Sequence, residues 1–290
     1  MRLDIIFGSN SDEGKVLPGI VRATQQIPGL EVMVHYASAD NTPDKVKKTV
    51  SMIKQSDYAT PKIFTSGAGM SNVLTGVVRT DATLNDLVIG VPITDSVTDG
   101  VSSVLSTSEK PPLNPVLTVG LNNTYAALNI AYRFALQKFG DVSVLGHHPI
   151  HHDKRDELFN AFSLFGLLNR VKARQGVHEI SPNDVVVSVY DHDCPLIQEV
   201  DERLRSGNGV QVFCSLGKPE DLKRYSHCLD RTEATGLVSA TGYKNAVMMT
   251  AQLLRYQPAL DIIAEMKDKK AKELEGHKGL YVKGGEVTKL

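Results

Sequence analysis

Residues 3–12 read LDIIFGSNSD, an apolar run of strand length that ends in a loop of glycine, serine, asparagine and aspartate. The pattern recurs at residues 30–43, where LEVMVHYASADNTP again closes an apolar run with small polar residues and one aspartate. A strand that ends in such a loop and precedes a helix-length segment is typical of a βαβ unit. Two such units in succession predict a parallel sheet whose loops gather at one edge.

The same alternation continues through the first half of the chain. We expect strands at 3–7, 30–36, 62–66, 87–91 and 114–119, and helices at 14–26, 42–55, 71–85 and 124–138. This order predicts an α/β fold with a parallel sheet. In an open parallel sheet the ligand lies beyond the carboxyl ends of the strands, so these loops should converge on one crevice.

A polar segment, GHHPIHHDKRD at residues 146–156, marks the expected boundary between two units, 1–145 and 146–290. In the second unit we expect a long helix at 156–174, a strand at 184–190, a helix at 196–206 and a strand at 209–216.

This second unit resembles a shortened copy of the first. LEVMVHYASADNTPDKVKK (30–48) aligns with VQVFCSLGKPEDLKR (210–224), and VLTVGLNNTYAALNIAYRFAL (116–136) aligns with GLVSATGYKNAVMMTAQLL (236–254). On this alignment the copy lacks the middle strands, and DHDCP at 191–195 takes the place of GSNSD at 8–12. The chain would then be an internal pseudo-dimer that ends in a helical arm.

Composition argues against two classes of partner. The 32 basic and 33 acidic residues give a formal net charge of −1, which offers no electrostatic footprint for nucleic acid. No apolar run reaches the ~18 residues that span a membrane, and the N-terminal run is too short for a signal peptide. We therefore expect a cytoplasmic protein.

The cysteines, Cys194, Cys214 and Cys228, follow no CxxC spacing, which favours reduced, buried thiols.

The first two loops carry the candidate chemistry. The amides of GSNSD at a helix N-terminus suit an anion or hydroxyl groups, and Asp12 can accept from a ligand diol. The alternative is that Ser11 or Asp12 merely caps the helix. In the second loop Thr42, followed by Pro43, has the pattern of a helix cap. Asp40 has no such structural role, and burial at the crevice would suit it to general acid work.

The next two loops extend the same edge. TSGAGMSN at 65–72 is a glycine-rich turn, but it lacks the GxGxxG and GK[ST] spacings, so a nicotinamide or ATP site is disfavoured. TDSVTDG at 94–100 adds Asp95, Ser96 and Asp99 to the rim.

Two histidine-containing segments remain ambiguous. His147, His148, His151 and His152 have ligand-like spacing, but a solvated linker is the favoured interpretation over a metal site. In DHDCP, residues Asp191, His192 and Asp193 form either a second site or a capped helix start, and we favour the cap.

Four ordered motifs make the first 140 residues recognisable. GSNSD, SAxxTP and GAGxSN after the first three strands and GVP at the fourth resemble the PurE family of aminoimidazole ribonucleotide (AIR) carboxylases and carboxyaminoimidazole ribonucleotide (CAIR) mutases of purine synthesis. GMSNVLTG at 69–76 looks closer to the carboxylase class. The resemblance implies a three-layer αβα fold with a flavodoxin-like parallel sheet.

The resemblance also implies a site and its chemistry. Ser9 and Asp12 would hold the ribose hydroxyls, and Ser11 and Ser38 would lie near the phosphate. Carbon dioxide or the substrate carboxyl group would lie in a dry pocket without any metal or organic cofactor. Gly67, Ala68 and Gly69 would line that pocket, and Asn41, Ser71 and Asn72 are further expected substrate-binding residues.

One departure separates this chain from the family pattern. The family motif SAH supplies a proton from histidine and is commonly followed by a basic residue, but here these positions are Asp40 and Asn41. A carboxylic acid can replace the histidine only if burial keeps it protonated near neutrality. Lys45 or Lys47 would have to replace the missing cation.

Two interpretations follow. The first is a divergent carboxylase or mutase with Asp40 as proton shuttle. The alternative is a non-catalytic or re-purposed paralogue that binds another ribonucleotide or heterocycle. Either form is expected to be a homo-oligomer, plausibly a tetramer of two-lobed chains.

Overall fold

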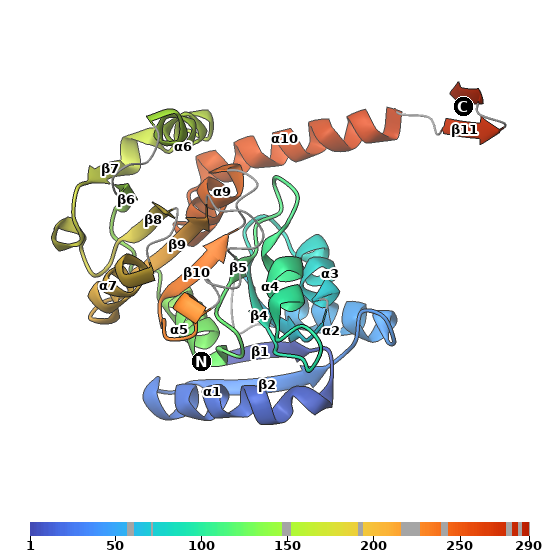
Figure 1. The fold of residues 1–290 in the computed structure, drawn as a ribbon, viewed down its shortest axis with the longest axis horizontal. Helices are drawn as coiled ribbons and strands as arrows, with labels where there is room; N and C mark the ends of the chain where they lie inside the picture. Colours follow the sequence, from blue (N-terminus) through green and yellow to red (C-terminus); the bar gives the residue numbers. More distant parts are fainter. Residues whose placement is uncertain are drawn as a thin grey trace.

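The computed structural model shows one mixed sheet between layers of helices (Figure 1). It describes residues 1–56, 61–70, 72–146, 152–190, 194–215, 227–238, 243–276, 280–283 and 286–289. Within these residues the sheet has ten strands in the order β2-β1-β3-β4-β5-β10-β9-β8-β6-β7. The α/β prediction is confirmed.

The N-terminal half, residues 1–141, supplies the first five strands of this order. Its elements are β1 Arg2–Phe7, α1 Glu13–Gln26, β2 Glu31–Tyr36, α2 Pro43–Gln55, β3 Ile63–Ala68, α3 Val73–Asp81, β4 Leu87–Pro92, α4 Val101–Ser108, β5 Leu117–Thr118 and α5 Thr124–Leu136. All neighbouring strands of this half pair in parallel.

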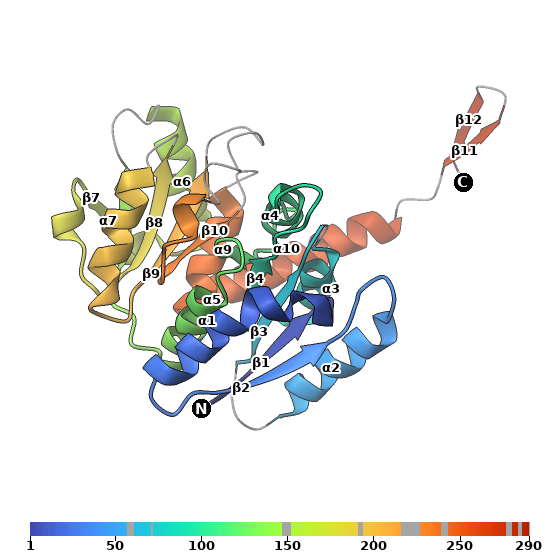
Figure 2. The same cartoon turned by 60° about the horizontal axis from the view of Figure 1, so that its bottom comes forward.

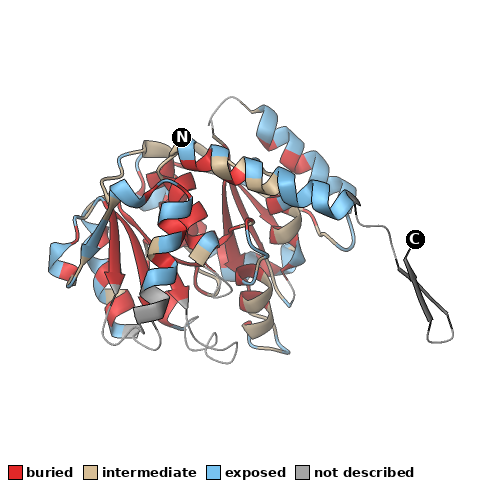
Figure 3. Ribbon diagram, turned by 90° about the horizontal axis from the view of Figure 1, so that it is seen from above, coloured by how far each residue is buried: buried red, intermediate tan, exposed pale blue. Residues whose placement is uncertain are grey.

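The C-terminal half, residues 142–290, supplies the other five strands of the sheet. Its elements are β6 Val142–Gly146, α6 His152–Leu164, β7 Val171–Arg174, β8 Val185–Tyr190, α7 Cys194–Arg205, β9 Val210–Ser215, β10 Thr235–Val238, α9 Tyr243–Leu253, α10 Gln257–Gly276, β11 Leu280–Lys283 and β12 Glu286–Lys289. The last two form a separate antiparallel hairpin. The exposed end of α10 extends beyond the body of the protein (Figures 1 and 3).

The two halves meet at an antiparallel junction, where Leu237 of β10 pairs with Thr118 of β5. Because each half is otherwise parallel, the strands of the two halves point in opposite directions. The chain therefore enters β10 at the edge of the sheet where β4 and β5 end. This arrangement brings the residues before β10 next to the loops of the N-terminal half.

Helices cover both faces of the sheet (Figure 2). One core packs α1, α5, α6 and α9 on one face, where Val16, Phe134, Phe162 and Met249 are fully buried. The opposite face is covered by α2 and α3 in the N-terminal half and by α7 in the C-terminal half. The predicted three-layer arrangement is thus present.

Several predictions about the second unit are wrong. The expected helix at 156–174 ends at Leu164, because Gly166 adopts a left-handed φ of 67° and residues 171–174 form the edge strand β7. The second half does not lack the middle strands. Residues 210–215 form β9 beside β10, whereas β2 lies at the outer edge, so their alignment fails. DHDCP follows β8, which holds the sheet position of β3, so it does not replace GSNSD.

The boundary between the units also differs from the prediction. β6 pairs only with β7 and β8 among the described strands, so the second set of strands begins at Val142 and not after residue 145. Helix α4 is an element that the sequence analysis did not anticipate.

Candidate functional site

Four loops of the N-terminal half lie side by side, because β2, β1, β3 and β4 are consecutive in the sheet. Backbone hydrogen bonds join neighbouring loops directly. The Gly8 N–H donates to the Gly67 carbonyl at 2.9 Å, and the Ile93 N–H donates to the Ala68 carbonyl at 3.2 Å. The predicted convergence of the polar loops on one edge is confirmed.

The loop after β1 presents a buried carboxylate. Ser9 caps a short 3-10 turn, since its Oγ accepts from the Ser11 N–H at 3.1 Å and lies 2.7 Å from the Ser11 hydroxyl. Asp12 is only 7% exposed, yet its side chain makes no capping hydrogen bond to α1. Burial raises the pKa of Asp12, and the nearby Lys15 ammonium partly offsets this effect. A buried carboxylate without a capping role suits a ligand hydroxyl donor.

The loop after β2 is held by its own side chains. Ser38 Oγ accepts from the backbone and side-chain nitrogens of Asn41 at 3.2 and 3.3 Å. Thr42 occupies the N-cap position of α2, where its hydroxyl accepts from the Ser38 N–H at 2.9 Å. Asp40 and Asn41 are exposed. The burial that proton transfer by Asp40 requires is therefore not provided by one chain without a ligand.

The end of β3 approaches its neighbours too closely for a side chain at Gly67. A Cβ there would lie 2.6 Å from the Val91 carbonyl and 3.0 Å from the Phe7 ring. Ala68 and Gly69 follow at the rim.

Asn72 has a structural role behind this rim. Its side chain is fully buried, accepts from the Thr75 N–H at 3.3 Å and donates to Thr107 Oγ1 at 2.8 Å. Asn72 therefore caps α3 and joins it to α4, and its side-chain amide is hydrogen-bonded to these two helices. Ser71 lies outside the described residues.

The loop after β4 is a preformed turn. Asp95 accepts from the backbone N–H groups of Val97 and Thr98 at 2.8 and 2.6 Å and from the Thr98 hydroxyl at 2.6 Å. The hydroxyl and backbone bonds from Thr98 lower the pKa of Asp95 to about 2. Asp95 thus remains ionised and shapes the turn, while Ser96 and Asp99 are exposed on it.

Lys15 and Tyr36 also belong to this region but were not anticipated. Lys15 Nζ donates to the Thr94 carbonyl at 2.5 Å, which links α1 to the fourth loop. Tyr36, at the end of β2, has its pKa raised to about 12 by burial and by its hydrogen bond to Glu13. The spacing of Lys15 from Asp12 is one helical turn, which is the signal that would have identified it.

The other expected sites give a mixed result. Residues 147–151 and 191–193 lie outside the described residues, as does the His152 side chain. Within the part of the chain that the structure describes, no group of three or more His, Cys, Asp or Glu side chains is placed to hold a metal ion. Cys214 is a free, buried thiol as expected, but Cys228 is disulfide-bonded, so the prediction of reduced thiols is wrong there.

Comparisons with known proteins match the N-terminal half. The family model for AIR carboxylase matches residues 2–140. An N5-carboxyaminoimidazole ribonucleotide mutase of Methanocaldococcus jannaschii is 36% identical over 118 residues, which are 41% of this chain and 68% of that protein. The mutase of Thermotoga maritima is 32% identical over 124 residues, 42% of this chain and 67% of that protein. A phosphoribosylaminoimidazole carboxylase of Candida glabrata is 32% identical over 157 residues, 53% of this chain and 24% of that protein.

Among the described helices, none is both long and apolar enough to cross a membrane.

Proposed function

Because the chain belongs to the AIR carboxylase (PurE) family, we propose that its N-terminal half binds an aminoimidazole ribonucleotide and interconverts AIR and CAIR. The observation that carries this proposal is Asp12, a buried carboxylate with no capping bond at the carboxyl edge of a parallel sheet. Helix α1 has no need of this group, so a ligand that donates hydroxyl hydrogen bonds accounts for it best.

The loops after β1, β2 and β3 each have a part in the proposed complex. Ser9 and Asp12 accept from the ribose hydroxyls, while Ser11, Ser38 and Asn41 lie at the phosphate. Gly67, Ala68 and Gly69 line the pocket for carbon dioxide or the carboxyl group, and Ser71 and Asn72 are further substrate-binding residues in this proposal. Lys15 is the cation that the structure adds beside Asp12, and Lys45 and Lys47 on α2 are exposed. No metal or organic cofactor takes part in this scheme.

Asp40 is the proposed proton shuttle. In the decarboxylation direction the Asp40 carboxyl group gives its proton to the imidazole carbon as the bond to the carboxylate breaks and carbon dioxide leaves. In the reverse direction the carboxylate removes that proton. Since Asp40 is exposed in a single chain, the ligand or a second chain must bury it to keep it protonated.

The test is decarboxylation of CAIR, followed by ultraviolet absorbance. We expect turnover by the wild type and a loss of at least ~100-fold for Asp40→Asn, the lower end of what general acids contribute. Asp44→Asn, at an exposed position at the start of α2, is the matched control and should retain activity. Asp40→His restores the family residue and should also support turnover. Full activity of Asp40→Asn would remove Asp40 from the mechanism.

The exposure of Asp40 favours one alternative function. A pocket that keeps the ribose-binding groups but leaves this carboxylate in solvent also suits a protein that binds a ribonucleotide or related heterocycle without turnover. Thermal-shift titration with CAIR and AIR separates the two proposals, because binding without decarboxylation supports the alternative.

We also propose that the two halves are copies of one unit and that the chain forms a homo-oligomer of two-lobed subunits, a tetramer, in the cytoplasm. The order β2-β1-β3-β4-β5 in one half and β7-β6-β8-β9-β10 in the other supports the duplication. Exposed Met70, Val73 and Val97 near the loops support a contact between chains. A monomer in light scattering at micromolar concentration contradicts the oligomer.

A further inference from the structure

A short segment of the C-terminal half, residues 228–232, lies directly on the turn that connects β5 to α5. Gly120 in this turn has no room for a side chain, because a Cβ would lie 2.5 Å from the Leu229 carbonyl and 2.6 Å from the Asp230 nitrogen. The two backbones are therefore packed against each other, although they are more than 100 residues apart in sequence.

Hydrogen bonds between residues 121–123 and residues 229–232 stabilise this contact. The Leu121 N–H donates to Asp230 Oδ1 at 2.9 Å. In return, the Asn123 amide donates to the carbonyls of Leu229, Asp230 and Thr232 at 3.2, 3.3 and 2.8 Å. The Asn123 side-chain oxygen meanwhile accepts from Ala126 and caps α5.

Between Leu121 and Asn123, Asn122 connects the turn to the candidate site. Asn122 adopts a left-handed φ of 56°, and its backbone N–H donates to the Pro92 carbonyl at 2.9 Å. Its side chain accepts from the Thr94 N–H and donates to the Thr94 hydroxyl, both at 3.0 Å. The Thr94 carbonyl accepts a hydrogen bond from Lys15, and the Lys15 ammonium attracts the Asp12 carboxylate electrostatically. One continuous chain of contacts thus runs from Asp230 to the ligand loops.

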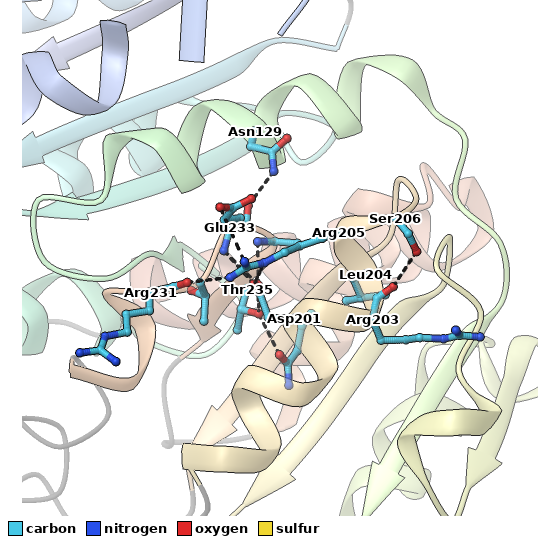
Figure 4. A network of polar contacts seen from close by, with 12 residues as sticks. Asn129, Asp201, Arg203, Leu204, Arg205, Ser206, Arg231, Glu233 and Thr235 are labelled. Atoms are coloured by element: carbon cyan, nitrogen blue, oxygen red, sulfur yellow. Dashed lines mark hydrogen bonds and ion pairs between the residues drawn. The ribbon is translucent and has the colours of Figure 1, made fainter. Parts of the chain in front are cut away.

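The segment is also anchored within its own half (Figure 4). The fully buried Asp201 of α7 accepts from the Glu233 and Ala234 N–H groups at 3.0 and 2.8 Å, and from the Thr235 hydroxyl at 2.8 Å. Arg205 donates to the Arg231 carbonyl at 2.9 Å. The segment can therefore hold the turn in place, since the residues that directly follow Asp230 are themselves fixed to α7.

We propose that residues 228–232 of the C-terminal half position the ligand loops of the N-terminal half, with Asp230 and Asn122 as positioning residues. The expected effect on CAIR binding and turnover rests on the proposed function. The expected effect on the position of the loop after β4 does not. The C-terminal half would then hold the loops of the candidate site in position at the antiparallel junction of β5 and β10.

The experiment compares Asp230→Ala with Asp230→Asn, whose side-chain oxygen still accepts from Leu121. Asn122→Gly removes the link to Thr94 but tolerates the left-handed backbone. Arg231→Ala is the control, because it alters an exposed side chain of the same segment. Melting temperatures establish that each variant is folded.

The first readout needs no nucleotide. Hydrogen–deuterium exchange of peptides covering residues 93–99 should rise about fivefold in Asp230→Ala and Asn122→Gly, the factor expected for one lost hydrogen bond. It should stay near the wild-type level in Asp230→Asn and Arg231→Ala. Unchanged exchange in folded Asp230→Ala overturns the proposal, because the turn would then hold Thr94 without the C-terminal half.

The second readout is CAIR affinity by calorimetry. Asp230→Ala and Asn122→Gly should each weaken binding about fivefold, and the double variant should bind no more weakly than either one, since both act through the same contacts. If the fold losses of CAIR affinity multiplied in the double variant, Asp230 and Asn122 would act independently, which contradicts the proposal. If the wild type does not bind CAIR, the proposed function fails, and the exchange result still decides whether Asp230 positions the loop.

Discussion

The substitution Asp201→Ala should reveal how strongly the junction of the two halves depends on one buried carboxylate. Asp201 accepts from two backbone N–H groups, those of Glu233 and Ala234, and within the described residues neither group donates to another acceptor. Thr235 keeps Gln211 as an alternative acceptor at 2.8 Å. Arg205 is partly exposed and can turn to water.

The magnitude follows from those two groups. A buried donor left without an acceptor costs ~1–3 kcal/mol; the Ala234 N–H is buried and the Glu233 N–H is part-buried, so we expect Asp201→Ala to lower the free energy of unfolding by at least ~1–3 kcal/mol. That is a large part of the ~5–15 kcal/mol that stabilises an ordinary domain. Asp201→Asn keeps one acceptor oxygen but places an NH2 group toward Arg205 or Glu233, so its loss should be smaller.

The assay is equilibrium unfolding in urea, with the free energy extrapolated to water. Glu202→Ala is the matched control, because Glu202 is the exposed neighbour of Asp201 on α7, and it should change stability by less than about 0.5 kcal/mol. If Asp201→Ala cost no more than Glu202→Ala, the two N–H groups would not depend on this carboxylate and the reasoning would be refuted.

Three further outcomes follow from the structure. Burial raises the pKa of Asp12, so its ionised form costs stability, and at pH 7 the wild type should be no more stable than Asp12→Ala. As the pH falls from the raised pKa through the ordinary value of 3.8, the free energy of unfolding of the wild type should increase relative to that of Asp12→Ala. If Asp12→Ala were instead less stable than the wild type by about 1 kcal/mol at pH 7, Asp12 would be a helix cap. Gly67→Ala should lower both the melting temperature and CAIR affinity, because its Cβ would lie 2.6 Å from the Val91 carbonyl; unchanged values in both assays would contradict this. Burial raises the pKa of Cys214 to about 12, so its thiol should resist iodoacetamide until the protein unfolds in urea, and rapid native alkylation would contradict that burial.

Local sequence patterns predicted the N-terminal half well, because each strand there ends in a loop with its own polar signature. The strands that end at Phe7 and Tyr36 and the helix start at Pro43 follow from apolar runs and helix-start residues. Asp12, Ser38 and Gly67 were predicted as site residues from the same loops, and their role in binding stays a prediction.

Helix α4 was missed because its sequence, VSSVLSTS, is poor in strong helix formers. The structure shows how it is accommodated. The hydroxyls of Ser106, Thr107 and Ser108 donate to carbonyls of the preceding turn. Buried packing then outweighs the low intrinsic propensity.

The contact of Asp230 with Leu121 had no local signal, since it joins residues 109 positions apart. This contact depends on the antiparallel pairing of β5 with β10. That pairing forms only when the whole C-terminal half packs beside the N-terminal half. The mistaken alignment of residues 30–48 with 210–224 has a similar cause. Two βα units share composition, and only their places in the sheet distinguish them.

The central claim is that the carboxyl edge of the N-terminal half binds an aminoimidazole ribonucleotide through Asp12. The most direct measurement is calorimetric titration of CAIR into the full chain and into Asp12→Ala. Binding by the wild type and an affinity at least ~10-fold lower in the variant are expected, since a hydrogen bond to a charged group contributes about 1.5–3 kcal/mol. Equal affinities, or no binding by the folded wild type, would contradict the claim.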